Sequence, residues 1–164
     1  RAFEDPNPVL FFEHKALYRT LTGQVPEGYY SLAFGKAAIA SEGTDLTIVT
    51  YGMGVHWALD LEKTEPDWNI EIIDLRTLAP IDFKTIETSV KKTGKALVLH
   101  EDCLAGGIGG DLVSTIQDRC WEYLDYAVKR VGSMDTPVPF SAVLEKQFLA
   151  SAKLREVAKK LIEA

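Results

Sequence analysis

The sequence predicts an α/β fold in which helices cover both faces of a largely parallel β-sheet. Short apolar runs alternate along the chain with segments whose apolar residues recur at helical spacing, the pattern of parallel sheets with helical crossovers. The apolar runs lack polar alternation, as expected of strands that are covered on both faces. A chain of 164 residues that is 46% hydrophobic can bury one sizeable core.

Five runs are expected to form strands. The strongest is LTIVTY at 46–51, which is rich in β-branched residues and ends at Gly52. The others are residues 36–40, 70–75, 96–99 and 127–131. Ligands of such sheets usually lie at the carboxyl ends of the strands. The candidate ends here are Tyr51-Gly52, Arg76-Thr77 and His100-Glu101.

Four segments are expected to form longer helices: residues 55–63, residues 80–92, a helix from about residue 110, and residues 151–164. In the second of these, Asp82 is the expected N-cap, and Phe83, Ile86 and Val90 share one apolar face.

The remaining segments are expected to be less regular. Residues 14–19 have the composition of a helical turn. Residues 20–35 are rich in turn formers and contain the expected domain boundary, and residues 133–144, with two prolines, are expected to be a loop. Trp57 and Trp121 fall at helical positions and are expected in the core.

Composition and charge exclude several classes of protein. The net charge is −6 and the pI is near 5.1, which disfavours a nucleic-acid binder but permits docking of a basic protein. No apolar run approaches the ~20 residues needed to span a bilayer. The first residues lack the apolar core of a signal peptide, and the absence of an initial Met suggests a piece of a longer chain.

The two cysteines, Cys103 and Cys120, do not have the spacing of a zinc site. We expect free thiols, with Cys120 buried in its helix and Cys103 in a loop. A nucleophilic role for Cys103 would need a base nearby, and His100 is near only in sequence.

The stretch HEDCLAGGIGGD at 100–111 resembles a phosphate-binding loop between a strand and a helix. A dinucleotide fingerprint would need a third glycine where Leu112 stands, and no P-loop lysine follows. Glu101, Asp102 and Asp111 would also repel a phosphate group. A tight strand-to-helix turn is therefore favoured, with Asp111 satisfying the amino end of the helix.

Two further residues have alternative interpretations. His100 beside Glu101 can be a general base with its orienting acid, or a structural histidine paired with the backbone or a subunit neighbour. Arg76 can bind an anion, or form a buried ion pair that fixes the loop to Pro80. His14 and His56 are weaker candidates.

Five blocks follow one another in the order of a known family. They are DPNPVLFFEHKALYR at 5–19, EGTDLTIVTYGMGVHWAL at 42–59, EIIDLRTLAPID at 71–82, TGKALVLHEDCLAGGIGGDL at 93–112 and RVGSMDTPVPF at 130–140. This set resembles the C-terminal domain of the beta subunit, or beta half of a fused chain, of thiamine-dependent 2-oxo acid dehydrogenases. The branched-chain (2-oxoisovalerate) type is most similar, followed by the pyruvate type.

The resemblance implies the fold of the transketolase C-terminal domain, a three-layer α/β/α sandwich on a mostly parallel, five-stranded mixed sheet. Residues 1–30 would be an interdomain linker segment from the preceding domain, and residues 31–164 the domain itself. The parent enzyme decarboxylates a 2-oxo acid with thiamine diphosphate and magnesium and transfers the acyl group to a lipoyl carrier. The family's metal motif, from GlyAspGly to AsnAsn, is absent, so this chain is expected to bind neither cofactor and to be inactive alone.

The same resemblance implies a role in assembly, in the bacterial cytoplasm or the mitochondrial matrix. The expected partners are the alpha chain or alpha half, a second copy of the chain, and the subunit-binding domain of the acyltransferase core. Asp125 and Glu122 are the docking candidates. The alternatives are another transketolase-like enzyme, such as a transketolase or a deoxyxylulose phosphate synthase, and a stand-alone anion-binding module that uses Arg76, His100 and the glycine loop.

Overall fold

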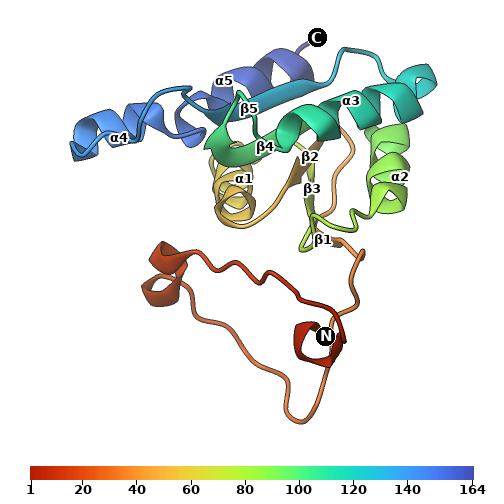
Figure 1. Cartoon of the computed structure of the whole chain (residues 1–164). Helices are drawn as coiled ribbons and strands as arrows, with labels where there is room; N and C mark the ends of the chain where they lie inside the picture. The colour runs from red at the N-terminus through yellow and green to blue at the C-terminus, as the bar shows by residue number, and fades with distance from the viewer.

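A computed structural model, which describes residues 1–164, contains one five-stranded mixed sheet (Figure 1). The strands are β1 (Ala38–Ser41), β2 (Leu46–Thr50), β3 (Ile70–Asp74), β4 (Ala96–Cys103) and β5 (Lys129–Ser133). Their spatial order is β1-β3-β2-β4-β5, in which β1 is antiparallel to β3 and the other pairs are parallel. The predicted fold class is confirmed.

Helices cover both faces of the sheet and produce the predicted three layers. They are α1 (Met53–Thr64), α2 (Phe83–Thr93), α3 (Gly109–Cys120), α4 (Ala142–Phe148) and α5 (Ser151–Ile162), with the 3-10 helices η1 (Ala2–Glu4), η2 (Lys15–Arg19) and η3 (Trp121–Tyr123). One buried cluster joins α1 and α5 to the sheet, and a second joins α2 and α3 to the opposite face.

Successive residues of each central strand contribute to different clusters. In β2, Ile48 packs in the cluster of α1 and α5, whereas Val49 packs in the cluster of α2 and α3. All five residues of β2 are buried. Burial on both faces is the reason that the strand sequences are continuously apolar.

The helix α2 begins at the expected signal and is followed by a glycine cap. The carboxylate of Asp82 accepts hydrogen bonds from the backbone N–H of Thr85 (3.2 Å) and of Ala37 (3.1 Å), so the predicted N-cap is confirmed. Burial raises the pKa of Asp82, but a hydrogen bond from the Thr85 hydroxyl and the two backbone hydrogen bonds outweigh it and hold the pKa below its ordinary value. The helix ends at Gly94, whose φ of 68° is left-handed.

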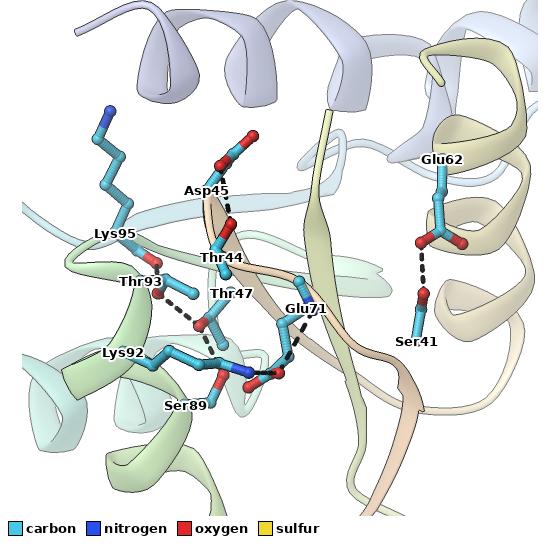
Figure 2. Close-up of polar contacts among 11 residues, drawn as sticks. Ser41, Thr44, Asp45, Thr47, Glu62, Glu71, Ser89, Lys92, Thr93 and Lys95 are labelled. Carbon is cyan, nitrogen blue, oxygen red and sulfur yellow. Dashed lines mark hydrogen bonds and ion pairs between the residues drawn. The ribbon is translucent and has the colours of Figure 1, made fainter. Parts of the chain in front are cut away.

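The polar side chains at the amino ends of β2 and β3 form a buried network (Figure 2). The Thr47 hydroxyl lies 2.7 Å from the hydroxyl oxygens of both Ser89 and Thr93 on α2. Beside it, the buried carboxylate of Glu71 pairs with Lys92. These contacts attach α2 to the sheet and satisfy polar groups that burial would otherwise leave without partners.

Several predicted boundaries differ from the structure. The strand expected at 96–99 continues to Cys103, and the strand expected at 127–131 lies two residues later. The loop expected at 133–144 is wrong at its end, because α4 begins at Ala142. In each case polar residues, glycine or proline occur next to or within a helix or strand, where the sequence pattern indicates a loop.

Trp57 packs partly buried against the core, but Trp121, which was also expected in the core, is 70% exposed at the end of α3. The prediction for Trp121 is therefore wrong, because the helical pattern of apolar positions ends at Cys120. No helix is long and apolar enough to cross a bilayer.

Residues 1–34, here called the amino-terminal segment, lie outside the layered domain (Figure 1). Their regular elements are two 3-10 helices, of which η2 confirms the turn predicted at 14–19. None of these residues is buried. The segment exposes Phe3, Leu10, Phe11, Phe12, Tyr18, Leu21, Val25, Tyr29, Tyr30 and Leu32.

Candidate functional site

The carboxyl ends of the parallel strands place several candidate residues along one edge of the sheet. Tyr51 follows β2, Arg76 follows β3, and His100 and Glu101 lie within β4. Because β2 separates β3 from β4, Arg76 and His100 stand about two strand spacings apart, roughly 9–10 Å. The partner of Arg76 in the structure is Asp74 on its own strand, and no ion pair or hydrogen bond joins Arg76 to His100 or the glycine loop.

His100 fills the space beneath the glycine loop. Its side chain is fully buried. A Cβ on Gly109 would lie 2.3 Å from its Nε2, and Cβ atoms on Gly107 and Gly132 would lie 3.1 and 2.7 Å from its Cε1. Gly107 and Gly109 of the loop, together with Gly132, therefore make room for an imidazole ring, and the loop is a tight turn, as favoured from the sequence.

The surroundings of His100 favour its neutral form. Burial, helped by the positive charge of Arg130, lowers the pKa of His100, and Asp102 opposes this only in part. Neither ring nitrogen has a hydrogen-bond partner in the structure. A neutral ring enclosed by backbone has no access to a substrate proton, so its position is that of a structural histidine.

Glu101 pairs with a different histidine. The Nε2 atom of His14 lies 3.0 Å from a carboxylate oxygen of Glu101. This pair joins the amino-terminal segment to the end of β4, across 87 positions of sequence. The hypothesis that Glu101 orients His100 is therefore wrong, and no local sequence signal pointed to His14.

Arg76 forms a local ion pair and not a buried one. Its Nε lies 3.6 Å from the carboxylate of Asp74, and its side chain is 45% exposed. Its backbone N–H donates to the same carboxylate. Its φ of 57° is unusual for a residue other than glycine. The loop to Pro80 is held instead by the Thr77 hydroxyl, which donates to the Pro80 carbonyl.

The acids of the glycine loop are arranged differently from the prediction. Asp111 is exposed in the first turn of α3 but accepts no hydrogen bond there, so its expected capping role is wrong. The loop is held from outside α3, because Asp135 accepts from the backbone N–H of Ala105. Asp111 can still favour the helix through its charge.

Both cysteines are free thiols, as predicted. Cys120 is fully buried, and burial raises its pKa. Cys103 is half-buried, and its Sγ donates to the carbonyl of Met134 at 3.2 Å. Nowhere in the structure do three His, Cys, Asp or Glu side chains gather in a geometry that can hold a metal ion.

Of the docking candidates, Glu122 lies in η3 and Asp125 lies just after it, before β5. Both side chains are exposed. The backbone N–H of Asp125 donates to the carbonyl of Gly94 at 2.8 Å, and its carboxylate lies against the Gly94 backbone. The structure therefore holds Asp125 firmly, whereas Glu122 projects without an ion-pair partner.

A surface groove of about 720 Å³ lies between α3 and β5, near these acids. It is lined by Gly110, Val113, Ser114, Gln117, Asp118, Trp121 and Arg130. Sequence reasoning missed this groove because Arg130 is brought to α3 only by the sheet. We call it the α3–β5 groove.

The sequence matches the family described as transketolase, C-terminal domain, over residues 35–153. Among solved structures, a split gene transketolase, described as an inactive beta4 tetramer, has a similar fold. Its TM-score is 0.69 at 22% identity, and the match covers 85% of this chain and 47% of that one.

Curated relatives are similar over nearly the whole chain. The 2-oxoisovalerate dehydrogenase subunit beta of Bacillus subtilis is 40% identical over 165 residues, and the pyruvate dehydrogenase E1 component subunit beta of the same organism is 42% identical over 165 residues. The matches cover 96% and 99% of this chain and 50% of each relative. The chain thus spans about half the length of these relatives, and it belongs to the transketolase C-terminal domain family.

Proposed function

We propose that this chain is the C-terminal domain of the beta subunit, or of the beta half of a fused chain, of a thiamine-dependent 2-oxo acid dehydrogenase. The extent of the similarity carries the proposal. The family match begins at residue 35, but the two Bacillus subtilis beta subunits match 96% and 99% of the chain. The likeness therefore includes the amino-terminal segment, which a shared domain fold alone does not require.

The proposed reaction of the parent enzyme is decarboxylation of a branched-chain 2-oxo acid and transfer of the acyl group to a lipoyl carrier. The blocks IIDLRTLAPID and MDTPVPF support a 2-oxo acid dehydrogenase over a transketolase or a deoxyxylulose phosphate synthase. Pyruvate dehydrogenase is the alternative candidate, because its beta subunit, at 42% identity, is as similar to this chain as the 2-oxoisovalerate subunit at 40%.

The residues of this chain do not fit thiamine diphosphate or magnesium. A magnesium diphosphate site needs clustered oxygen ligands, and three acidic or imidazole side chains do not gather anywhere in this structure. The interior of the glycine loop is filled by His100, and Glu101 and Asp102 stand at its entrance. The domain is therefore proposed to act in assembly and docking, with catalysis in other parts of the parent enzyme.

Residues 1–30 are proposed to be the linker segment from a preceding domain, and residues 31–164 the domain itself. The absence of buried side chains in the amino-terminal segment, together with its many exposed aromatic and aliphatic residues, supports this division. Exposed apolar side chains gathered in this way mark a surface that contacts another protein segment.

The proposed partners are the alpha chain or alpha half, a second copy of the chain, and the subunit-binding domain of the acyltransferase core. Asp125 and Glu122 are the proposed contacts of the last, a small basic domain that an acidic chain of net charge −6 would attract. The proposed location is the bacterial cytoplasm or the mitochondrial matrix.

Capture of the subunit-binding domain tests this proposal. With that domain immobilised, surface plasmon resonance should show binding of the wild-type chain. Asp125→Lys and Glu122→Lys should slow association, and the effect should shrink as salt is added. Asp67→Lys, which makes the same charge change at an exposed position between α1 and β3, should leave association unaffected.

Two results would contradict the proposal. One is the absence of binding by the wild-type chain at low salt. The other is micromolar binding of thiamine diphosphate to the chain by calorimetry, which would contradict the assignment of the cofactor to other domains.

A further inference from the structure

A single pair of side chains joins the amino-terminal segment to the layered domain. The Nε2 atom of His14 lies 3.0 Å from one carboxylate oxygen of Glu101 and 3.2 Å from the other. Every other hydrogen bond or ion pair of residues 1–34 lies within the segment. Neither buried cluster of the domain includes a side chain of these residues, which Figure 1 shows as a loop apart from the sheet and its helices. We call the pair of His14 and Glu101 the clasp.

The only other attachment of the segment is the place where it enters the domain. The backbone N–H of Gly35 donates to the Thr77 hydroxyl oxygen at 3.0 Å. If the clasp opens, the chain is therefore released as far as Gly35, and the released chain gains conformational entropy. Because the segment buries no side chain, little opposes this gain. The docked and released positions therefore differ little in free energy, and one contact can decide between them.

The strength of the clasp depends on a proton. Histidine ordinarily changes its charge between pH 5 and 8, whereas carboxylates are ordinarily ionised above about pH 5. A neutral imidazole can donate one hydrogen bond to Glu101, but an imidazolium adds its charge, and charge-assisted hydrogen bonds are roughly twice as strong. The Nδ1 atom of His14 is buried and has no partner. The ring therefore has no second hydrogen bond that would hold it once the charge is lost.

The charged and titratable groups around the clasp are mostly acids. On the domain they are Glu101 and Asp102 of β4 and the phenol of Tyr51 after β2. Burial and the charges of both carboxylates raise the pKa of Tyr51, so it stays neutral. On the segment, Glu13 and Lys15 flank the histidine in the sequence. Three acids and one base thus surround the clasp, and this surrounding charge favours the docked position when the histidine is charged.

We propose that the clasp is a pH-sensitive latch, which docks the amino-terminal segment on the end of β4 when His14 is protonated and releases it when His14 is neutral. The docked position is expected to dominate near pH 5.5 and the released position near pH 7.5. Phe11 and Phe12, which are exposed just before His14, then change position relative to the domain. The inference goes beyond the proposed function, because it needs neither the thiamine reaction nor a partner chain.

His100 is a second source of pH dependence, but it acts in the opposite direction. Burial lowers the pKa of His100, so its protonation at low pH destabilises the folded domain. A segment that becomes more ordered as the pH falls therefore reports on the clasp and not on His100.

Backbone ¹⁵N relaxation tests the proposal. In the 164-residue chain, the heteronuclear NOE values of residues 9–20 should match those of the domain at pH 5.5 and fall toward those of a released chain at pH 7.5. His14→Arg keeps a positive charge at both pH values and should hold the segment at both. His14→Gln and Glu101→Gln each remove one charge, and the segment should lose its high NOE values at pH 5.5 as well.

The matched control is His56→Gln, which removes a histidine on α1 and should behave like the wild type. The NOE values of the domain strands, measured in the same spectra, check the fold of each variant. If Glu101→Gln disturbs β4, the two His14 variants still decide the outcome, because His14 lies outside the layered domain.

Three results would overturn the proposal: wild-type segment NOE values that are equal at both pH values, a His14→Gln chain that keeps the wild-type pH dependence, or a Glu101→Gln chain as ordered as the wild type at pH 5.5. Each of them would leave the capture of the subunit-binding domain unaffected. A chain that orders its segment at low pH but does not capture that domain would support this inference and contradict the proposed function.

Discussion

Gly109→Ala is predicted to destabilise the fold because the new methyl group would collide with His100. The Cβ would lie 2.3 Å from His100 Nε2, over 1 Å closer than the 3.4 Å at which ordinary contacts begin. The ring is fully buried between Gly107 and Gly132 and cannot move away. Overpacking of this kind costs about 1–3 kcal/mol, of which the better helix propensity of alanine offsets at most about 1 kcal/mol.

Gly110→Ala is the matched control in the same turn of α3. Its Cβ would approach only the Nη1 atom of Arg130, at 3.0 Å, the far end of a flexible side chain. This variant should be as stable as the wild type or more stable by up to about 1 kcal/mol. Urea unfolding of the two variants measures the difference directly. If Gly109→Ala were as stable as Gly110→Ala, the assignment of the glycine loop to packing around His100 would be refuted.

Three further predictions concern buried polar groups. The pKa of His100 in the folded chain is lowered from 6.5, so below that pH the unfolded chain binds more protons than the folded one. The free energy of unfolding should therefore be highest above pH 6.5 and fall below it by up to about 1.4 kcal/mol per pH unit. Urea unfolding measured across this pH range checks the slope, and a His100→Gln variant that kept the same slope would contradict the prediction. Asp82→Ala should cost about 1–2 kcal/mol through loss of the α2 cap, with Lys84→Ala, an exposed site on the same helix, near neutral. Thr47→Val should cost about 1–3 kcal/mol in thermal unfolding, because the Ser89 and Thr93 hydroxyls lose a shared partner.

The boundaries that could be predicted belong to elements whose start and end are marked by residues nearby in the sequence. The central strands β2 and β3 are rich in Ile, Leu and Val because both of their faces are covered and nearly every residue is buried. The cap at Asp82 was predictable because its hydrogen bond to Thr85 spans three residues. Each of these signals lies within a few positions of sequence.

The elements that were misplaced depend on contacts between distant residues. The strand β5 includes Gly132 and Ser133, which resemble turn residues, but Gly132 is needed beside His100 and the Ser133 hydroxyl donates to the Glu101 carbonyl. The pairing of His14 with Glu101 and the meeting of Arg130 with α3 follow from strand order. A single sequence does not contain that order in any local pattern.

The single antiparallel strand determines where the amino-terminal segment meets the sheet. Ala38 at the start of β1 is aligned with Asp74 at the end of β3. The chain therefore enters the sheet at the edge where the parallel strands end. A parallel β1 would have brought it in at the opposite edge, about 13–16 Å away. The amino-terminal segment therefore reaches the domain on the side where Arg76 follows β3, and from there its His14 can pair with Glu101 on β4.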